Sequence, residues 1–154
     1  MNKILIILVV FSIDRLFKIY LINLINSGIE VDFYIFPFLN FFLVWNNGIG
    51  FGLMSMQANI FYHILSLIIM LINLLLIYFL FKAKNLQAYM LIFVVGGSLG
   101  NLFDRIYYYA VPDFIDFHVG DFHWFIFNIG DIFISLGIIG LILLELFAEK
   151  KMKT

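Results

Sequence analysis

Four long apolar runs constrain this chain more than any other feature of its sequence. Each run has 20 to 22 residues, and about 20 apolar residues suffice to cross the hydrocarbon core of a bilayer as a helix. The runs cover residues 4–25, 60–81, 88–107 and 127–147. Because 64% of the 154 residues are apolar and only 12% are charged, a water-soluble globule is excluded. We predict an all-α polytopic membrane protein that forms a single integral membrane domain.

The positions of the basic residues predict how the chain is threaded. Six of the nine Lys and Arg residues lie near the ends of the chain or between the second and third runs, at Lys3, Lys82, Lys84, Lys150, Lys151 and Lys153. The connections 27–59 and 108–126 contain no Lys or Arg. The positive-inside bias therefore predicts cytoplasmic termini and two outward-facing segments. No small-residue cleavage site follows the first run, so we expect it to be retained as a span.

The outer segment 27–59 is more apolar than an ordinary loop. Val31–Phe36 and Phe38–Trp45 are rich in aromatic and β-branched residues, and Pro37 separates them. This pattern predicts a small sheet at the membrane surface. The alternative is an irregular interfacial loop anchored by Trp45. The chain has no cysteine, which excludes disulfides and thiolate chemistry, and its net charge of -1 gives no reason to expect a nucleic-acid partner.

Three charged residues near the middle of the first run indicate a function inside the membrane. Asp14, Arg15 and Lys18 each cost roughly 2.5 to 3.5 kcal/mol on insertion, which nearly cancels the gain from the apolar residues of the same run. Such residues are expected to face a partner or a wet cavity. Asp14 and Lys18 lie four residues apart, so they can pair on one helical face. The alternative is a buried ion pair that only fixes helix packing.

A second set of polar residues ends the third run. Asn101, Asp104 and Arg105 lie three or four residues from one another or from Gly97, so they are expected to share a helix face. Arg105 lies next to Asp104 in the sequence and could hold it ionised as a structural carboxylate.

Two acidic residues could meet at the outer surface. Asp131 lies about one turn into the fourth run and shares a face with Asn128 and Ser135, while Asp113 belongs to the outer segment 108–126. If two carboxylates approach to about 4 Å, their repulsion of about 4 kcal/mol at an effective dielectric of 20 makes them share one proton. The ionised group can then activate water while its protonated partner polarises a carbonyl. The residues alone leave Asp104 and Asp116 open as partners of Asp131.

The remaining polar residues offer weaker alternatives. His118 and His123 lie near Asp116 and Asp121, but their spacing matches no metalloprotease motif, and we expect no metal. A small membrane transporter or proton carrier could also use intramembrane carboxylates. A helix-packing scaffold would use the same residues only as structural ion pairs.

Five motifs, in order, resemble those of lipoprotein signal peptidase, or signal peptidase II, of the bacterial cytoplasmic membrane. Asp14–Lys18 resembles the family's Asp-x-x-(Ser/Thr)-Lys, and Asn46–Phe51 resembles Asn-x-Gly-Ala-Ala-Phe. Gly96–Arg105 resembles Gly-Gly-Ala-Leu-Gly-Asn-Leu-x-Asp-Arg. Val111–Phe117 resembles Val-Val-Asp-Phe-Ile-Asp-Phe, and Phe127–Asp131 resembles Phe-Asn-x-Ala-Asp. The resemblance covers nearly the whole chain.

The resemblance implies an aspartic peptidase with Asp113 and Asp131 as its catalytic pair. The substrate-binding or supporting positions then fall on Asp14, Lys18, Asn46, Gly48, Asn101, Asp104, Arg105 and Asn128. It also implies four transmembrane helices with a small extracytoplasmic β-sheet, located in the inner membrane with the site at its outer face. The implied partners are membrane lipids and a prolipoprotein whose cysteine carries diacylglycerol, cut just before that cysteine. No cofactor is expected.

The sequence departs from the family pattern at four positions. Phe17 replaces a hydroxyl residue, Gly50 and Gly130 replace alanines, and Pro112 precedes Asp113 where valine is usual. None of these departures removes a carboxylate. Pro112 restricts the backbone before Asp113 and lacks an N–H, so the geometry beside this aspartate is the point most open to change.

Overall fold

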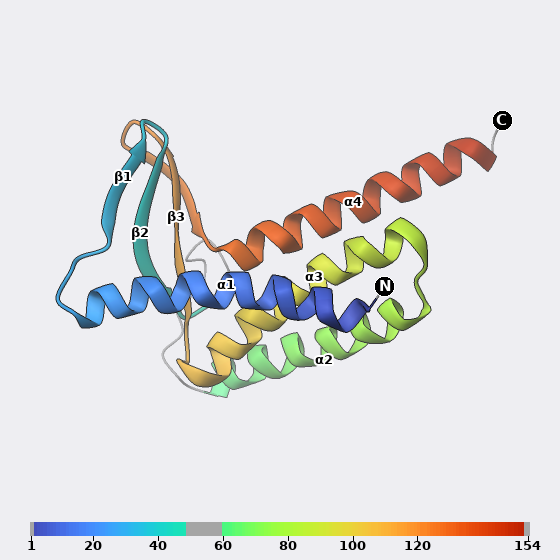
Figure 1. Cartoon of the computed structure of the whole chain (residues 1–154), viewed down its shortest axis with the longest axis horizontal. Helices are drawn as coiled ribbons and strands as arrows, with labels where there is room; N and C mark the ends of the chain where they lie inside the picture. The colour runs from blue at the N-terminus through green and yellow to red at the C-terminus, as the bar shows by residue number, and fades with distance from the viewer. Residues whose placement is uncertain (1, 49–59, 153–154) are drawn as a thin grey trace.

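The computed structural model describes residues 2–48 and 60–152 of the chain. Four helices and four strands alternate in groups along the sequence (Figure 1). They are α1 (Lys3–Asn26), β1 (Asp32–Phe36), β2 (Leu39–Asn46), α2 (Ile60–Lys82), α3 (Asn85–Tyr107), β3 (Val111–Val119), β4 (Phe122–Phe127) and α4 (Ile129–Met152). The sheet lies at one end of the helices, and both chain termini lie toward the other end (Figure 1).

The four apolar runs correspond to the four helices. Among the described residues, three helices are long and apolar enough to cross a membrane: Tyr62–Lys82, Asn85–Tyr107 and Ile129–Ala148. Helix α1 is equally long, but its middle carries Asp14, Arg15 and Lys18, all of which are buried. The fourth run was predicted to begin as helix at residue 127, but Phe127 ends β4 and pairs with Ile115 of β3.

Helix α3 is the central helix and packs against α1, α2 and α4. Its glycines permit this close packing. A Cβ atom at Gly100 would lie 2.6 Å from a carboxylate oxygen of Asp14 on α1, so only glycine leaves room for that side chain. By contrast, α2 and α4 present exposed Leu, Ile and Phe side chains along their outer surfaces, as expected for helices that face lipid.

The sheet contains four antiparallel strands in the order β1-β2-β3-β4. Strands β1 and β2 confirm the prediction for 31–45, and the irregular-loop alternative is wrong for these residues. Strands β3 and β4 were not predicted, because 108–126 was interpreted only as an outer connection. Asp113 therefore lies on a strand, opposite Val44 of β2. A strand fixes the direction of the Asp113 side chain more firmly than a loop would.

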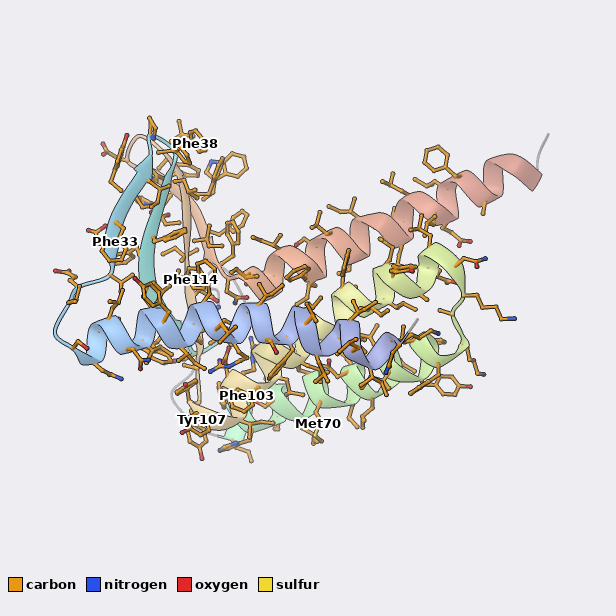
Figure 2. The ribbon with its side chains drawn as sticks, in the orientation of Figure 1. Phe33, Phe38, Met70, Phe103, Tyr107 and Phe114 are labelled. Atoms are coloured by element: carbon orange, nitrogen blue, oxygen red, sulfur yellow. The ribbon has the colours of Figure 1, made fainter. Side chains whose placement is uncertain are left out.

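A small apolar core fixes the sheet against α1. It contains Leu21, Val31, Phe114 and Ile115, and Phe114 is fully buried. Phe17 of α1 stacks on Phe114 with the ring centroids 6.2 Å apart, and Figure 2 shows Phe114 between the sheet and this helix. Phe17, which departs from the motif Asp-x-x-(Ser/Thr)-Lys, thus adds an aromatic contact between α1 and the residue that follows Asp113.

Candidate active site

Asp113 and Asp131 line the same cavity, which has a volume of about 500 Å³. Strand β3 supplies Asp113 and the first turn of α4 supplies Asp131. The cavity lies between the sheet, α3 and α4, and its lining residues are Asn46, Asn101, Arg105, Val111, Asp113, Phe125, Ile126, Phe127, Asn128, Asp131, Ile132, Ser135 and Leu136. Of the three carboxylates considered as partners of Asp131, only Asp113 is brought into this cavity.

Two asparagine side chains hold the Asp113 carboxylate. Asn128 donates from Nδ2 to Oδ1 at 2.6 Å, and Asn46 donates from Nδ2 to Oδ2 at 2.9 Å. Asp113 is only 4% exposed. Burial, followed by the negative charge of Asp131, raises the pKa of Asp113 to about 6, although both amide donors act in the opposite direction. The sequence led us to expect that charge repulsion alone would raise the pKa of one of the two aspartates. In the structure, removal of Asp113 from water contributes more to its raised pKa than the charge of Asp131 does.

Asp131 is positioned by the start of its own helix. The Asp131 backbone N–H donates to Oδ1 of Asn128 at 3.0 Å, and the Asn128 backbone N–H donates to Oδ2 of Asp131 at 3.1 Å. This reciprocal pair is a capping box, which satisfies two N–H groups that a helix start leaves without partners. Asn101 of α3 donates to the other oxygen, Oδ1 of Asp131, at 2.8 Å.

Asn128 connects the two carboxylates directly. Its side-chain amide binds Asp113 and its backbone N–H binds Asp131. With Asn46 and Asn101 added, each of the four carboxylate oxygens accepts a hydrogen bond from a side-chain or backbone N–H. These donors orient both groups toward one cavity while leaving further lone pairs available.

A buried ion cluster lies behind Asn101. Lys18 Nζ is 2.7 Å from Oδ2 of Asp14 and 2.7 Å from Oδ2 of Asp104, and it donates to Oδ1 of Asn101 at 2.8 Å. The predicted pairing of Asp14 with Lys18 is confirmed. Arg15 pairs with the other oxygen of Asp104. Two cations thus face two carboxylates, a balance that permits their burial inside an apolar protein.

The alternative in which Arg105 holds Asp104 is wrong, because Arg15 and Lys18 are the partners of Asp104; the expectation that Asp104 and Arg105 share one helix face is wrong as well. Consecutive helical residues are turned by about 100° from each other, so these two side chains leave α3 in different directions. Arg105 turns to the cavity and donates to the carbonyl oxygens of Asn101, at 3.2 Å, and Gly48, at 3.3 Å. Gly48 in turn donates to Oδ1 of Asn46 at 3.0 Å. Arg105 therefore ties the end of β2 to α3.

The departures from the family pattern fit this geometry where they are described. A Cβ atom at Gly130 would lie 2.9 Å from Oδ1 of Asn128 and 3.0 Å from the Gly97 carbonyl oxygen, so glycine gives α4 a close approach to α3. Pro112 lies opposite Trp45 of β2, before the pairing of β3 with β4 begins at Ile115. Its missing N–H therefore removes no bond to β4. Gly50 lies outside the described residues.

The other polar candidates lie away from the two carboxylates. His123 pairs with Asp116 at 2.8 Å toward the far end of the sheet, and its ring stacks on His118 with centroids 5.1 Å apart. Within residues 2–48 and 60–152, His, Asp and Glu form no group of three suited to a metal ion. The aromatic wall that β4 gives the cavity, at Phe125 and Phe127, was missed. The alternating aromatic residues after Gly120 were the available signal.

These features, apolar helices with a cavity that holds two aspartates near the end that carries the sheet, define a membrane-embedded enzyme. Two solved structures described as bacterial membrane enzymes determined by the in meso method, at 2.3 and 1.9 Å resolution, share the fold. The first has a TM-score of 0.75 and 32% identity, and the match covers 99% of this chain and 92% of that one. The second has a TM-score of 0.74 and 30% identity, covering 94% and 92%.

The particular family follows from the sequence. The family model described as signal peptidase (SPase) II matches residues 6–147, so the chain belongs to the signal peptidase II family and is a membrane peptidase. A lipoprotein signal peptidase of Pelagibacter ubique is 49% identical over 95% of this chain and 88% of its own length. One from Anaplasma phagocytophilum is 39% identical over 90% and 87%.

Proposed function

We propose that this enzyme removes the signal peptide from diacylglyceryl-modified prolipoproteins, cutting just before the modified cysteine. Membership of the signal peptidase II family and the printed names of the relatives support this substrate class. The observation that carries the proposed chemistry is the pair Asp113 and Asp131, linked by Asn128 in one cavity. The proposed site needs neither a cofactor nor a metal.

The pair divides the work between an acid and a base. The raised pKa of Asp113 keeps its proton at mildly acidic pH, so Asp113 donates a hydrogen bond to the carbonyl oxygen of the scissile bond. Asp131 is ionised and takes a proton from a water molecule, whose oxygen attacks the carbonyl carbon. When the tetrahedral intermediate collapses, the C–N bond breaks and the cysteine nitrogen receives a proton from the pair.

The buried ion cluster supports the ionised state of Asp131. Lys18 donates to the side-chain oxygen Oδ1 of Asn101, which orients the side-chain NH₂ group of Asn101 toward Asp131. Asn101 therefore donates to the Asp131 carboxylate. The positive charge of Lys18 polarises this amide group and strengthens the hydrogen bond. In this role Asp14 and Asp104 hold Lys18 in place. These residues position the pair without touching the substrate.

The substrate reaches the site from the membrane plane. We propose that all four helices cross the bacterial cytoplasmic membrane, because the three charged residues of α1 are buried against α3 rather than turned to lipid. Both termini then lie on the cytoplasmic side, and the sheet lies on the outer side. The pair meets a lipid-anchored substrate at the outer interface, with membrane lipids around α2 and α4.

Asn46 and Arg105 are the proposed contacts for substrate carbonyl or ester oxygens at the polar end of the cavity. Both side chains line it, and an arginine presents five N–H donors, more than its two contacts with Asn101 and Gly48 use. Unchanged lipopeptide affinity in Arg105→Ala, with Asp113 and Asp131 intact, would remove this role.

Cleavage of a diacylglyceryl-modified lipobox peptide by purified enzyme tests the function. Asp113→Asn and Asp131→Asn should each lower kcat by about 10²- to 10⁴-fold, the usual contribution of acid–base groups. Asp116→Asn is the matched control, because Asp116 lies on the same strand as Asp113 but pairs with His123. Wild-type levels of cleavage by either dyad variant would exclude the proposed pair. Failure of the wild-type enzyme to cut the modified peptide would exclude the substrate.

A further inference from the structure

Ser135 places a hydroxyl group on the wall of the cavity, one turn beyond Asp131 on the same face of α4. The four intervening steps correspond to about 6 Å along the helix axis. The neighbouring cavity residues on this side are Ile132 and Leu136 of α4 and the β4 segment 125–127. Ser135 is thus a polar group in an otherwise apolar part of the cavity.

The Ser135 hydroxyl has no hydrogen-bond partner among residues 2–48 and 60–152; Ser12 of α1 shares this property, but of the two only Ser135 lines the cavity. Ser66 of α2 donates to the Tyr62 carbonyl oxygen at 2.9 Å, and Ser27 donates to the Asn23 carbonyl oxygen at 2.8 Å. Such bonds to the preceding turn are the usual way for a serine to satisfy its hydroxyl within one helix. Ser135 is exposed toward the cavity instead.

In the apolar part of a membrane site, a hydroxyl group without a hydrogen-bond partner is costly. The same condition applies to the substrate. A peptide that is cut must be extended at the scissile bond, so carbonyl groups freed from a helix also need donors. A hydroxyl donor on the wall and a carbonyl acceptor on the substrate satisfy each other.

We propose that Ser135 is a substrate-binding residue whose hydroxyl donates to a carbonyl oxygen of the bound substrate. This inference rests on the proposed function and deepens it. An extended peptide advances about 3.3 Å per residue, so the hydroxyl reaches a backbone carbonyl about two residues before the cut. An acyl ester carbonyl of the diacylglyceryl group offers the same chemistry. Ser135 thereby gives the apolar part of the cavity a preference for substrates with a carbonyl at this position.

Purified variants and modified substrates test the inference. Ser135→Ala should lower kcat/KM by about 3- to 10-fold, the range expected for one hydrogen bond, mainly through KM. Ser135→Thr keeps the hydroxyl and should stay near wild type. Ser66→Ala is the matched control, because it removes a helical hydroxyl that already has a partner; its kinetics should be unchanged.

Two substrate analogues distinguish the source of the carbonyl. One replaces the backbone carbonyl two residues before the cut by an alkene, and the other replaces both acyl esters by ethers. The analogue that lacks the contacted carbonyl should be a poorer substrate for the wild type, with no further loss for Ser135→Ala. Equal penalties in both enzymes, for both analogues, would overturn the inference. If the wild type did not cut the unmodified lipopeptide at all, the proposed function would fail first.

Discussion

Replacing Gly97 by alanine should disable the site without touching either carboxylate. Gly97 of α3 lies against Gly130 of α4, the residue immediately before Asp131. A methyl group at Gly97 would fall roughly 1 Å short of an ordinary van der Waals separation from the Gly130 carbonyl oxygen. Backbone atoms lie on both sides of this contact, so no side chain can turn away. The start of α4 must move instead.

The size of this movement determines the expected decrease in kcat. The hydrogen bond from Asn101 to Asp131 measures 2.8 Å, so a displacement of about 1 Å takes it beyond hydrogen-bonding distance. A misplacement of about 1 Å can cost roughly 10²-fold in rate. We therefore expect Gly97→Ala to lower kcat about 100-fold while KM changes little, because the rest of the cavity wall stays in place.

Gly140→Ala provides the matched control on the same pair of helices. Its added methyl group would meet the sulfur of Met90, which is the end of a flexible side chain. That sulfur can move aside, so Gly140→Ala should stay near wild type. Both variants are assayed for lipopeptide cleavage and for thermal unfolding in detergent, so that activity is counted per folded molecule. A Gly97→Ala enzyme that keeps more than about a third of the wild-type kcat would refute the reasoning.

Two further predictions concern charge. Since Asp113 must carry a proton and its pKa is about 6, kcat/KM should fall as the pH rises through this value, and it should also fall at lower pH, where Asp131 takes up the proton that the mechanism requires it to lack. Asn46→Ala removes a donor that stabilises the charged form of Asp113, so the midpoint should move to higher pH; a lower midpoint in the pH–rate profile would contradict the assignment. Asp104→Ala leaves two buried cations facing one carboxylate and should lower the free energy of unfolding by about 3–5 kcal/mol. Lys82→Met, which removes an exposed contact with Tyr78, is the control for this denaturation experiment, and equal losses in both variants would contradict the buried cluster.

Much of this fold could be predicted because the membrane simplifies the problem. A run of about 20 apolar residues has few alternatives to a spanning helix, and all four runs are helical over most of their length. The ion pair between Asp14 and Lys18 followed from their spacing on one helix. Local geometry within a helix was thus accessible from the sequence.

Contacts between elements were harder to predict. Asp104 finds Arg15 and Lys18 on another helix rather than its sequence neighbour Arg105, because packing decides which side chains meet. Strands β3 and β4 were missed although only Gly120 and Asp121 separate them, because the absence of Lys and Arg in 108–126 was interpreted only as a sign of its side of the membrane. Burial of Asp113, the larger cause of its raised pKa, likewise depends on the packing around it.

Only Asn128 separates β4 from α4. This direct junction limits where residues can be inserted without moving Asp131. Inserting one residue after Asn128 would rotate Asp131 by about 100° about the helix axis and shift it by about 1.5 Å, away from Asn101. The turn at Gly120 joins β3 and β4 outside the cavity, so extra residues there would leave the carboxylates where they are. Insertions should therefore be tolerated at the hairpin and abolish activity at the junction.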